Sequence, residues 1–174
     1  MKKVFALVAL FALTASMALA QKTGYVDSGK IMDAIPEYKA AQDEIENVSQ
    51  KWQQDLEAKY KAIEKMYADY QAQEVLMPDD LKQEKQEEIF QAEREAKEYR
   101  EQKFGYNGEL FTLQESKVKP IQDKVFRAVE AVAQRKRFNF IFDKSGETTW
   151  MYTDATYDLT DEVMSELGVG DEGR

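Results

Sequence analysis

The stretch that decides the fold is PEYKAAQDEIENVSQKWQQDLEAKYKAIEKMYADYQAQEVLMPDD, residues 36–80. From Pro36 to about Arg135, apolar or small residues recur at alternating steps of three and four, the spacing of a coiled-coil seam. One extra step of four, around Trp52, locally relaxes the left-handed supercoil. On the first arm the seam residues are Tyr38, Ala41, Ile45, Val48, Trp52, Leu56, Tyr60, Ile63, Tyr67 and Tyr70.

The same spacing continues on a second arm after a short break at residues 75–80. Its seam residues are Leu81, Ile89, Ala92, Ala96, Tyr99, Tyr106, Leu110, Leu113, Ile121, Val125, Ala128 and Val132, with Lys85, Lys103 and Lys117 filling further seam positions. Because proline disfavours helix at the residue before it, the first arm is predicted to end by Met77, and Asp79 or Asp80 to cap the second. Two arms of like period joined by so short a break predict an antiparallel hairpin, roughly 60 Å long at about 1.5 Å per residue. A hairpin of that length must project from the rest of the chain.

The second arm contains three residues that weaken a helix. Gly105 and Gly108 each cost about 1 kcal/mol relative to alanine, and Pro120 lacks an N–H. The seam keeps its phase from Tyr99 through Leu113 to Val132. We therefore expect bends at these residues and no true end of the helix.

The first twenty residues are predicted to be a cleaved leader. Lys2 and Lys3 precede a short apolar run, and the small residues of Ala18-Leu19-Ala20 suit signal peptidase, which gives a mature start at Gln21. The run is too short to span a bilayer, which needs about 20 apolar residues. The sequence thus predicts export, and loss of the two lysines takes the formal charge from −9 to −11.

The ends of the mature chain predict a small β-containing body. Residues 22–27 form one expected strand, and Ser28 is the expected cap of a short helix over 30–35. Residues 138–142 and 148–152 are two aromatic, β-branched runs around a turn-rich segment, which predicts a hairpin. Thr160 is the expected cap of a last helix, which Gly168 ends.

The predicted fold class is therefore α+β and mostly helical, with a small β-body and a long helical hairpin. The expected divisions are a leader over 1–20, body segments over 21–35 and 136–168, the hairpin over 36–135 with its tip near 75–80, and a tail over 169–174. So small a body cannot cover all its aromatic residues, and uncovered apolar surface is usually resolved by association of copies. The candidates for this oligomer interface are Tyr25, Val26, Phe138, Phe140, Phe142, Trp150 and Tyr152.

In order and spacing, these segments resemble the Skp/OmpH family of periplasmic chaperones for outer-membrane proteins. The resemblance is carried by Gly24-Tyr25-Val26-Asp27, by IMDAIPEY at 31–38, by the charged hairpin, by FNFIFD at 138–143, and by Tyr157 to Thr160. It implies a homotrimer in the periplasm, whose strands form a central body and whose three hairpins surround a cavity. Unfolded outer-membrane proteins would be held in that cavity without ATP.

The charge of this chain departs from the family pattern. Familiar members tend to be basic, whereas this sequence carries 33 acidic and 24 basic residues. An acidic surface is repelled by anionic lipid and by nucleic acid. The sequence therefore predicts no nucleic-acid partner and argues against contact with the membrane or with lipopolysaccharide.

No constellation in the sequence predicts catalysis, a cofactor or a metal. Histidine and cysteine are absent, which removes the usual general base and the common zinc ligands. Acidic pairs are numerous in so charged a chain, and those at 154–158 lack the regular pattern of an EF-hand. Gly168-Val169-Gly170 precedes no helix and so is no phosphate loop.

Client contacts are predicted at apolar residues outside the seam. Phe90, Phe104 and Phe111 lie one place off it, and Val75, Leu76 and Met77 form the tip. The predicted function is an ATP-independent holdase of the periplasm that keeps unfolded outer-membrane proteins from aggregating. The alternative is a coiled-coil envelope spacer or adaptor, which would bind one folded partner.

Overall fold

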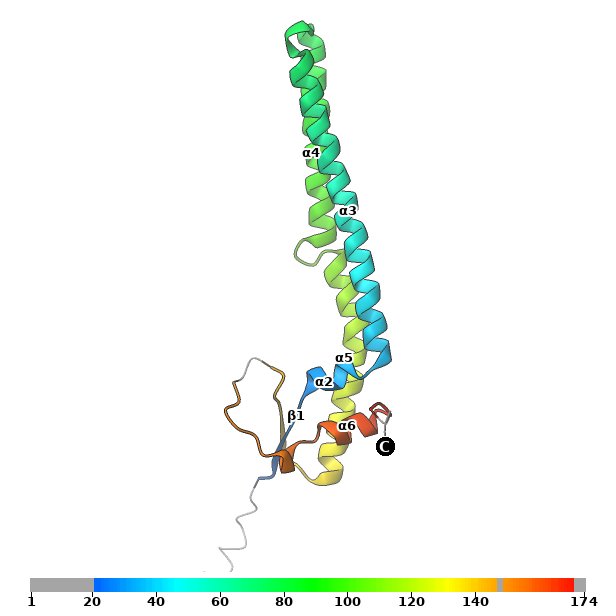
Figure 1. The fold of residues 1–174 in the computed structure, drawn as a ribbon, viewed down its shortest axis with the longest axis vertical. Coiled ribbons are helices and arrows are strands. Elements are labelled where there is room, and N and C mark those ends of the chain that lie inside the picture. The colour runs from blue at the N-terminus through cyan, green and yellow to red at the C-terminus, as the bar shows by residue number, and fades with distance from the viewer. Residues whose placement is uncertain (1–20, 147–148, 171–174) are drawn as a thin grey trace, which may run out of the picture. The chain divides into compact units, whose positions relative to one another are not determined.

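The computed structural model describes residues 21–146 and 149–170, and the chain divides into two compact units (Figure 1). One unit, which we call the arm, is Pro36–Gln122. The other, which we call the body, joins the described residues 21–35 with 123–146 and 149–170. The predicted leader, Thr148 and the last part of the predicted tail lie outside the described residues.

The arm is an antiparallel helical hairpin, as the periodicity predicts. It consists of α3 (Pro36–Gln73), the 3₁₀ turn η1 (Glu74–Leu76), α4 (Asp79–Phe104) and the start of α5 (Glu109–Lys136). Figure 1 shows α3 and α4 running side by side, and the 38 residues of α3 span about 57 Å at about 1.5 Å each. Seam residues of these two helices are buried: Ala41, Leu56, Ile63, Tyr70, Ile89 and Ala96. The predicted fold class is confirmed.

Not every seam residue is buried. Leu56, Ile63 and Tyr70, seven residues apart, are buried, whereas Tyr60 and Tyr67 of the alternate row are exposed. The Tyr67 hydroxyl donates to Glu93 Oε1 across the hairpin at 2.9 Å, so its ring lies at the edge of the groove. Two helices in contact bury one row fully and leave the second at the rim.

The tip differs from the prediction in its cap. The first arm ends at Gln73, and Pro78 occupies the N-cap position of α4, so neither Asp79 nor Asp80 caps it. The carbonyl oxygen of Pro78 accepts the first backbone hydrogen bond, from Lys82 N at 3.0 Å. Both aspartates lie inside the first turn, where their charge still favours the helix dipole.

The second arm is broken, and the expectation of mere bends is wrong. α4 ends at Phe104, a four-residue loop follows, and α5 begins at Glu109. A Cβ at Gly105 would lie 2.3 Å from the carbonyl oxygen of Glu101, and Asn107 has φ +58°. Tyr106, predicted on the seam, therefore stands in the loop and is 95% exposed. At Pro120, by contrast, α5 continues without interruption.

The body contains a two-stranded parallel sheet, and the predicted hairpin is wrong. β1 (Thr23–Val26) pairs with β2 (Phe140–Asp143), Tyr25 opposite Phe142. Thr149–Tyr152 form no strand. On its other edge β1 receives a hydrogen bond from Leu159 N to the Tyr25 carbonyl oxygen at 2.9 Å. β1 is therefore the central element of the body, with a partner on each edge. Its partner strand β2 is parallel, and parallel strands can be joined only by a long connection.

The body's core is small and comes from β1, the helices and the loops. α2 (Ser28–Asp33) and α6 (Thr160–Glu166) pack against each other. The largest fully buried side chains are Ile31, Ile35, Val132, Leu159 and Val163. None of them comes from β2, whose residues remain partly or fully exposed.

Asp27 caps α2, whereas Leu159 occupies the N-cap position of α6 and makes no side-chain cap. The caps predicted at Ser28 and Thr160 are therefore wrong. Asp27 accepts from Lys30 N at 2.9 Å at the start of α2. At α6, Asp158 Oδ1 accepts from Thr160 N at 2.9 Å, and Thr160 itself is the first helical residue. The hydroxyl groups of both residues instead donate to carboxylates, that of Ser28 to Asp143 and that of Thr160 to Asp158, because a charged acceptor is stronger than a neutral one.

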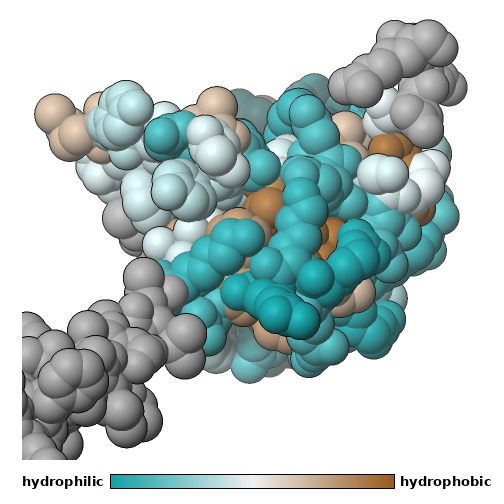
Figure 2. Space-filling model, turned by 90° about the horizontal axis from the view of Figure 1, so that it is seen from below, coloured by the Kyte–Doolittle hydropathy of each residue, from teal (hydrophilic) through white to brown (hydrophobic). Residues whose placement is uncertain are grey.

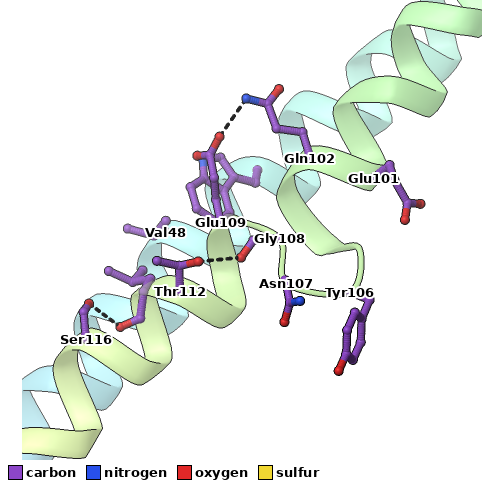
Figure 3. Close-up of a pocket in the computed structure, with 11 residues that line it drawn as sticks. Val48, Glu101, Gln102, Tyr106, Asn107, Gly108, Glu109, Thr112 and Ser116 are labelled. Carbon is purple, nitrogen blue, oxygen red and sulfur yellow. Dashed lines mark hydrogen bonds between the residues drawn. The ribbon is translucent and has the colours of Figure 1, made fainter.

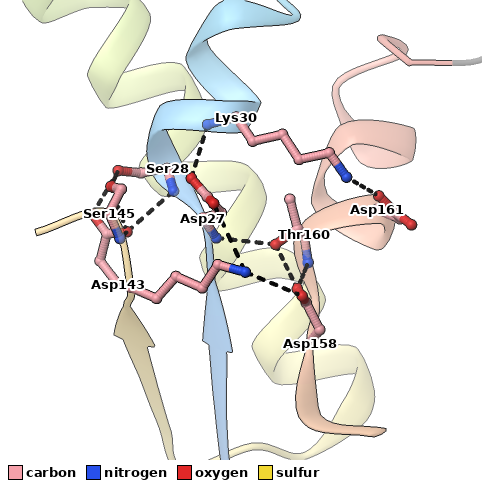
Figure 4. Close-up of polar contacts among 9 residues, drawn as sticks. Asp27, Ser28, Lys30, Asp143, Ser145, Asp158, Thr160 and Asp161 are labelled. Carbon is pink, nitrogen blue, oxygen red and sulfur yellow. Dashed lines mark hydrogen bonds and ion pairs between the residues drawn. The ribbon is translucent and has the colours of Figure 1, made fainter. Parts of the chain in front are cut away.

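These carboxylates tie the two ends of the chain together (Figure 4). Asp143 accepts from Ser28 N at 3.1 Å and Ser28 Oγ at 2.5 Å, and from Ser145 N and Oγ at 3.0 and 2.8 Å. Thr160 Oγ1 accepts from Asp27 N at 3.0 Å and donates to Asp158. Burial raises the pKa of Asp143, but its hydrogen bonds outweigh burial and hold that pKa below its ordinary value. The same balance lowers the pKa of Asp158.

We expect the body to lose stability in acid through Asp143. A carboxyl whose pKa is lowered by folding stabilises the fold above its unfolded pKa, near 3.9, and loses that contribution as the pH falls through its lower folded pKa. Asp143→Asn should lower the free energy of unfolding by about 1 kcal/mol at pH 7, a small value because the side chain is largely exposed. It should also make unfolding less sensitive to pH below about 4.

Urea denaturation at several pH values measures both effects. Asp33→Asn is the control, since Asp33 is exposed on α2 and makes no contact in this network. The comparison is made between about pH 5 and pH 3, a range that brackets the unfolded pKa of aspartate. If Asp143→Asn and the wild-type protein lose equal free energy of unfolding over that range, the role given to Asp143 is contradicted.

Candidate functional site

Two phenylalanines of the arm are exposed, as a contact surface requires. Phe90 on α4 leaves 56% of its surface exposed and Phe111 on α5 leaves 51%. Both lie one place beyond a seam residue, next to Ile89 and Leu110, and the helix therefore turns them away from the groove centre. Their role as client contacts remains a prediction.

Phe104, the third predicted contact, is half-buried and packed. Its ring meets the ring of Trp52 edge to face, with centroids 6.3 Å apart and planes at 84°. Lys103 lies over the same Trp52 ring, 4.8 Å from its centroid, and forms a 2.5 Å ion pair with Glu109. The structure thus separates Phe104 from the other two: it is part of a cluster that joins α3, α4 and α5.

The tip carries a second exposed apolar group. Val75 and Leu76 in η1 are almost fully exposed. Met77 is half-buried and lines a small pocket of about 240 Å³ between α3 and α4, together with Tyr70 and Ile89. Two of the three predicted tip contacts are therefore available to a partner without any change in the hairpin.

A larger hollow lies beside the break in the second arm (Figure 3). Its volume is about 730 Å³, and Val48, Trp52 and Leu113 supply apolar walls. The remaining lining residues are Glu101, Gln102, Tyr106, Asn107, Gly108, Glu109, Thr112 and Ser116. Reasoning from the seam misses this hollow. The signal that could have found it is Gly105-Tyr106-Asn107-Gly108, a run of turn-forming residues inside a helical pattern.

The predicted interface residues of the body divide into two groups. Tyr25 and Val26 are buried within the single chain, whereas Phe140, Phe142, Trp150 and Tyr152 are exposed. Phe142 and Trp150 meet edge to face at 5.8 Å, and Lys22 lies 4.1 Å from the centroid of the half-buried Phe138 ring. Figure 2 shows small hydrophobic areas among larger hydrophilic ones on one face of the molecule. In the described chain, the outer edge of β2 has no strand partner.

The described residues show neither a metal centre nor a membrane span. Within 21–146 and 149–170, no group of three or more acidic side chains is placed to hold a metal ion. No helix among these residues is both long enough and apolar enough to cross a bilayer.

Residues 22–167 match the model of a protein family described as outer membrane protein (OmpH-like). The chain belongs to the OmpH-like family. The match spans most of the sequence and includes both the arm and the β-strands of the body. No curated protein matches the chain in a sequence comparison.

The fold of this OmpH-like chain is also found among solved structures. One is a Caulobacter crescentus protein described as an outer membrane chaperone (OmpH-like), with a TM-score of 0.67 and 12% sequence identity. The alignment covers 83% of this chain and 82% of that one. At so low an identity the likeness establishes the fold and leaves individual residues to be argued from this structure.

We expect Phe104 and Phe90 to behave differently when replaced. Phe104→Ser removes a half-buried ring from the Trp52 cluster and should lower the free energy of unfolding by about 1–2 kcal/mol, less than the 3–5 kcal/mol of a full core position. Phe90→Ser is the matched control and should change it by about 0.5 kcal/mol or less, since that ring is mostly in solvent. Urea denaturation followed by circular dichroism measures both, and equal losses would contradict the division between packed and exposed rings.

Proposed function

We propose that this OmpH-like protein is an ATP-independent holdase of the periplasm that binds unfolded outer-membrane proteins. The observation that carries the proposal is the exposure of Phe90, Phe111, Val75 and Leu76 on a long, highly charged helical hairpin. Isolated exposed apolar residues are ordinary, but here they recur along an element that buries only a narrow seam. Family membership and the fold of a chaperone described as OmpH-like support the same function.

Binding would be the sum of weak contacts. Burying a whole phenylalanine side chain contributes about 1.5–3 kcal/mol, and a ring on an open helix face recovers only part of that. Several arms around one client would raise the effective concentration of each contact, which strengthens holding without any tight site. A client would leave when its own folding buries the segments that the arms contact.

Assembly into a homotrimer is part of the proposal. The single chain leaves Phe140, Phe142 and Tyr152 exposed, and β2 has an open edge in the described part of the body. Exposed strand edges and aromatic patches favour association with further copies. The number three comes from the family resemblance, and the exposed residues supply the physical reason for association.

The charge of the arm bears on its partners. Residues 36–122 contain 20 acidic and 13 basic side chains, a formal charge of −7. Anionic lipid would be repelled by such a surface, whereas basic segments of an unfolded chain would be attracted. We therefore propose protein clients and no direct binding to the membrane or to nucleic acid.

The holding function is tested by aggregation assays with several unfolded β-barrel proteins. The double variant Phe90→Ser/Phe111→Ser should weaken client binding about fivefold, which corresponds to a loss of about 1 kcal/mol. Helix content should be unchanged, because both rings lie off the seam. Gln83→Ser/Gln114→Ser, at exposed polar positions of the same two helices, is the control and should bind as the wild type does.

A wild-type protein that suppresses no aggregation but binds one folded partner at fixed stoichiometry would contradict the holdase and favour a spacer or adaptor. Equal client affinity for both double variants would contradict the contact surface alone.

The assembly is tested by sedimentation and by the concentration dependence of unfolding. The mature protein should sediment as a trimer, and its midpoint of denaturation should rise with protein concentration because folding and association are coupled. Phe140→Ser/Tyr152→Ser should shift the protein toward smaller species, since both side chains are exposed in the single chain. A monomer whose unfolding is independent of concentration would overturn the proposed architecture.

A further inference from the structure

The hollow beside the loop Gly105–Gly108 is a built recess and no gap left by poor packing. Its polar walls are held by their own hydrogen bonds: Thr112 Oγ1 donates to the carbonyl oxygen of Gly108 at 3.2 Å, and Ser116 Oγ to that of Leu113 at 2.9 Å. Gln102 Nε2 donates to Glu109 Oε1 at 2.8 Å across the break (Figure 3). These side chains of the lining are therefore held in place before anything binds.

The apolar side of the hollow is fixed as well. Trp52 is held by its edge contact with Phe104 and by Lys103 above its ring. Val48 precedes it by one turn of α3, and Leu113 faces both from α5 as a lining residue. A volume of about 730 Å³ takes one large side chain together with part of the backbone that carries it.

The charges that line the hollow all have one sign. Glu101 and Glu109 are the only lining residues with ionised side chains. Glu109 is paired with Lys103 at 2.5 Å, whereas the side-chain carboxylate of Glu101 has no ion-pair or hydrogen-bond partner within the described residues. A free carboxylate on the rim of an acidic arm favours a cationic group in the occupant.

Tyr106 adds an aromatic surface at the hollow. Its ring is 95% exposed on the loop and packs against nothing that would hold it (Figure 3). Such a ring can stack on an aromatic side chain of a ligand or on a lysine or arginine head group. The conformation of the loop, with Asn107 at φ +58°, keeps it out of the helical seam.

We propose that this hollow is a preformed anchor for an extended client segment that carries an aromatic side chain next to lysine or arginine. The aromatic side chain enters between Val48, Trp52 and Leu113, and the neighbouring cation lies at Glu101. A second copy of the arm is disfavoured as the occupant, because its formal charge is also −7. The inference rests on the proposed function, since the occupant is a segment of an unfolded client.

This anchor differs in kind from the contacts at Phe90 and Phe111. Those rings lie on open helix faces and can contact any apolar group, so they would bind client segments without discriminating among them. The hollow is an open recess lined by residues of α3, α4, the loop and α5, and its ionised lining residues are both acidic. It therefore gives the arm a preference among client segments that the exposed phenylalanines alone lack.

The test uses the full mature protein and short labelled peptides. One peptide alternates tyrosine with lysine; its partners replace lysine by glutamate, or tyrosine by serine. Fluorescence anisotropy should show that the tyrosine–lysine peptide binds at least about tenfold more tightly than either partner, since each partner lacks one of the two recognised groups. Added salt should weaken binding of this peptide more than that of an uncharged tyrosine–serine peptide.

Variants locate the binding in the hollow. Ser116→Trp fills the hollow from α5 and should reduce affinity for the tyrosine–lysine peptide about tenfold or more. Gln114→Trp, at an exposed position of the same helix outside the hollow, should leave affinity unchanged. Glu101→Gln should reduce affinity about two- to fivefold, as expected for one exposed charge pair, and should not affect the uncharged peptide.

Each outcome decides the proposal. Equal affinity for Ser116→Trp and Gln114→Trp, or equal binding of the lysine and glutamate peptides, overturns it. If circular dichroism shows that Ser116→Trp disturbs the arm, Glu101→Gln and the peptide series decide in its place. A change of sedimentation caused by Ser116→Trp alone would assign the hollow to contact between copies and would also overturn it.

The same set separates this inference from the proposed function. Aggregation suppression without peptide selectivity contradicts the anchor and leaves the holdase standing. Selective peptide binding without aggregation suppression contradicts the holdase.

Discussion

The packing of α3 against α4 is the constraint on which the arm depends. Two helices in contact bury one stripe each, so most of their surface must face solvent whatever its sequence. The buried row Leu56, Ile63 and Tyr70 holds the hairpin together, and the remaining positions are free to carry charge. Phe90, one place beyond the buried Ile89 of α4, is then exposed without cost to the seam. A surface of scattered apolar groups in a charged field is thus a consequence of hairpin geometry as much as of selection for binding.

The break at Gly105–Gly108 depends on the same seam. Four residues leave the helix, and α5 must re-enter beside α3 on the far side of the loop. The cluster of Trp52, Phe104, Lys103 and Glu109 bridges the break, which explains why a lysine can occupy a seam position. Its charge is neutralised by Glu109 from the next helix, and its ammonium group lies over the indole ring of Trp52. The hollow is the space that this bridging leaves open.

The sequence predicts the arm far better than the body, and the reason is physical. A seam repeated over ten positions is a local signal that survives small errors of phase. The pairing of Tyr25 with Phe142 joins residues far apart in the sequence, so no local pattern reveals it. An aromatic run followed by turn residues is equally typical of a β-hairpin. The predicted caps are wrong for a related reason: the Ser28 hydroxyl donates to Asp143 of a distant segment, and the Thr160 hydroxyl donates to Asp158 and accepts from Asp27 N. At the candidate site, the exposure of Phe90 follows from its position one place off the seam. The hollow could be predicted only by recognising that the loop Gly105–Gly108 ends the helix.

Electrostatic attraction and apolar contact act over different distances, and the proposed binding would use them at different steps. At physiological salt, fields fall off over about 8 Å, so the negative charge of the arm cannot draw a client from afar. In the proposed function, contact would begin with the exposed apolar side chains at the tip and on the helix faces. Charge acts only once a segment lies on the arm, where a basic neighbour stays and an acidic one is repelled. In the proposed holdase, the apolar residues would therefore determine whether a segment binds, and the carboxylates, Glu101 foremost, would determine which segments remain.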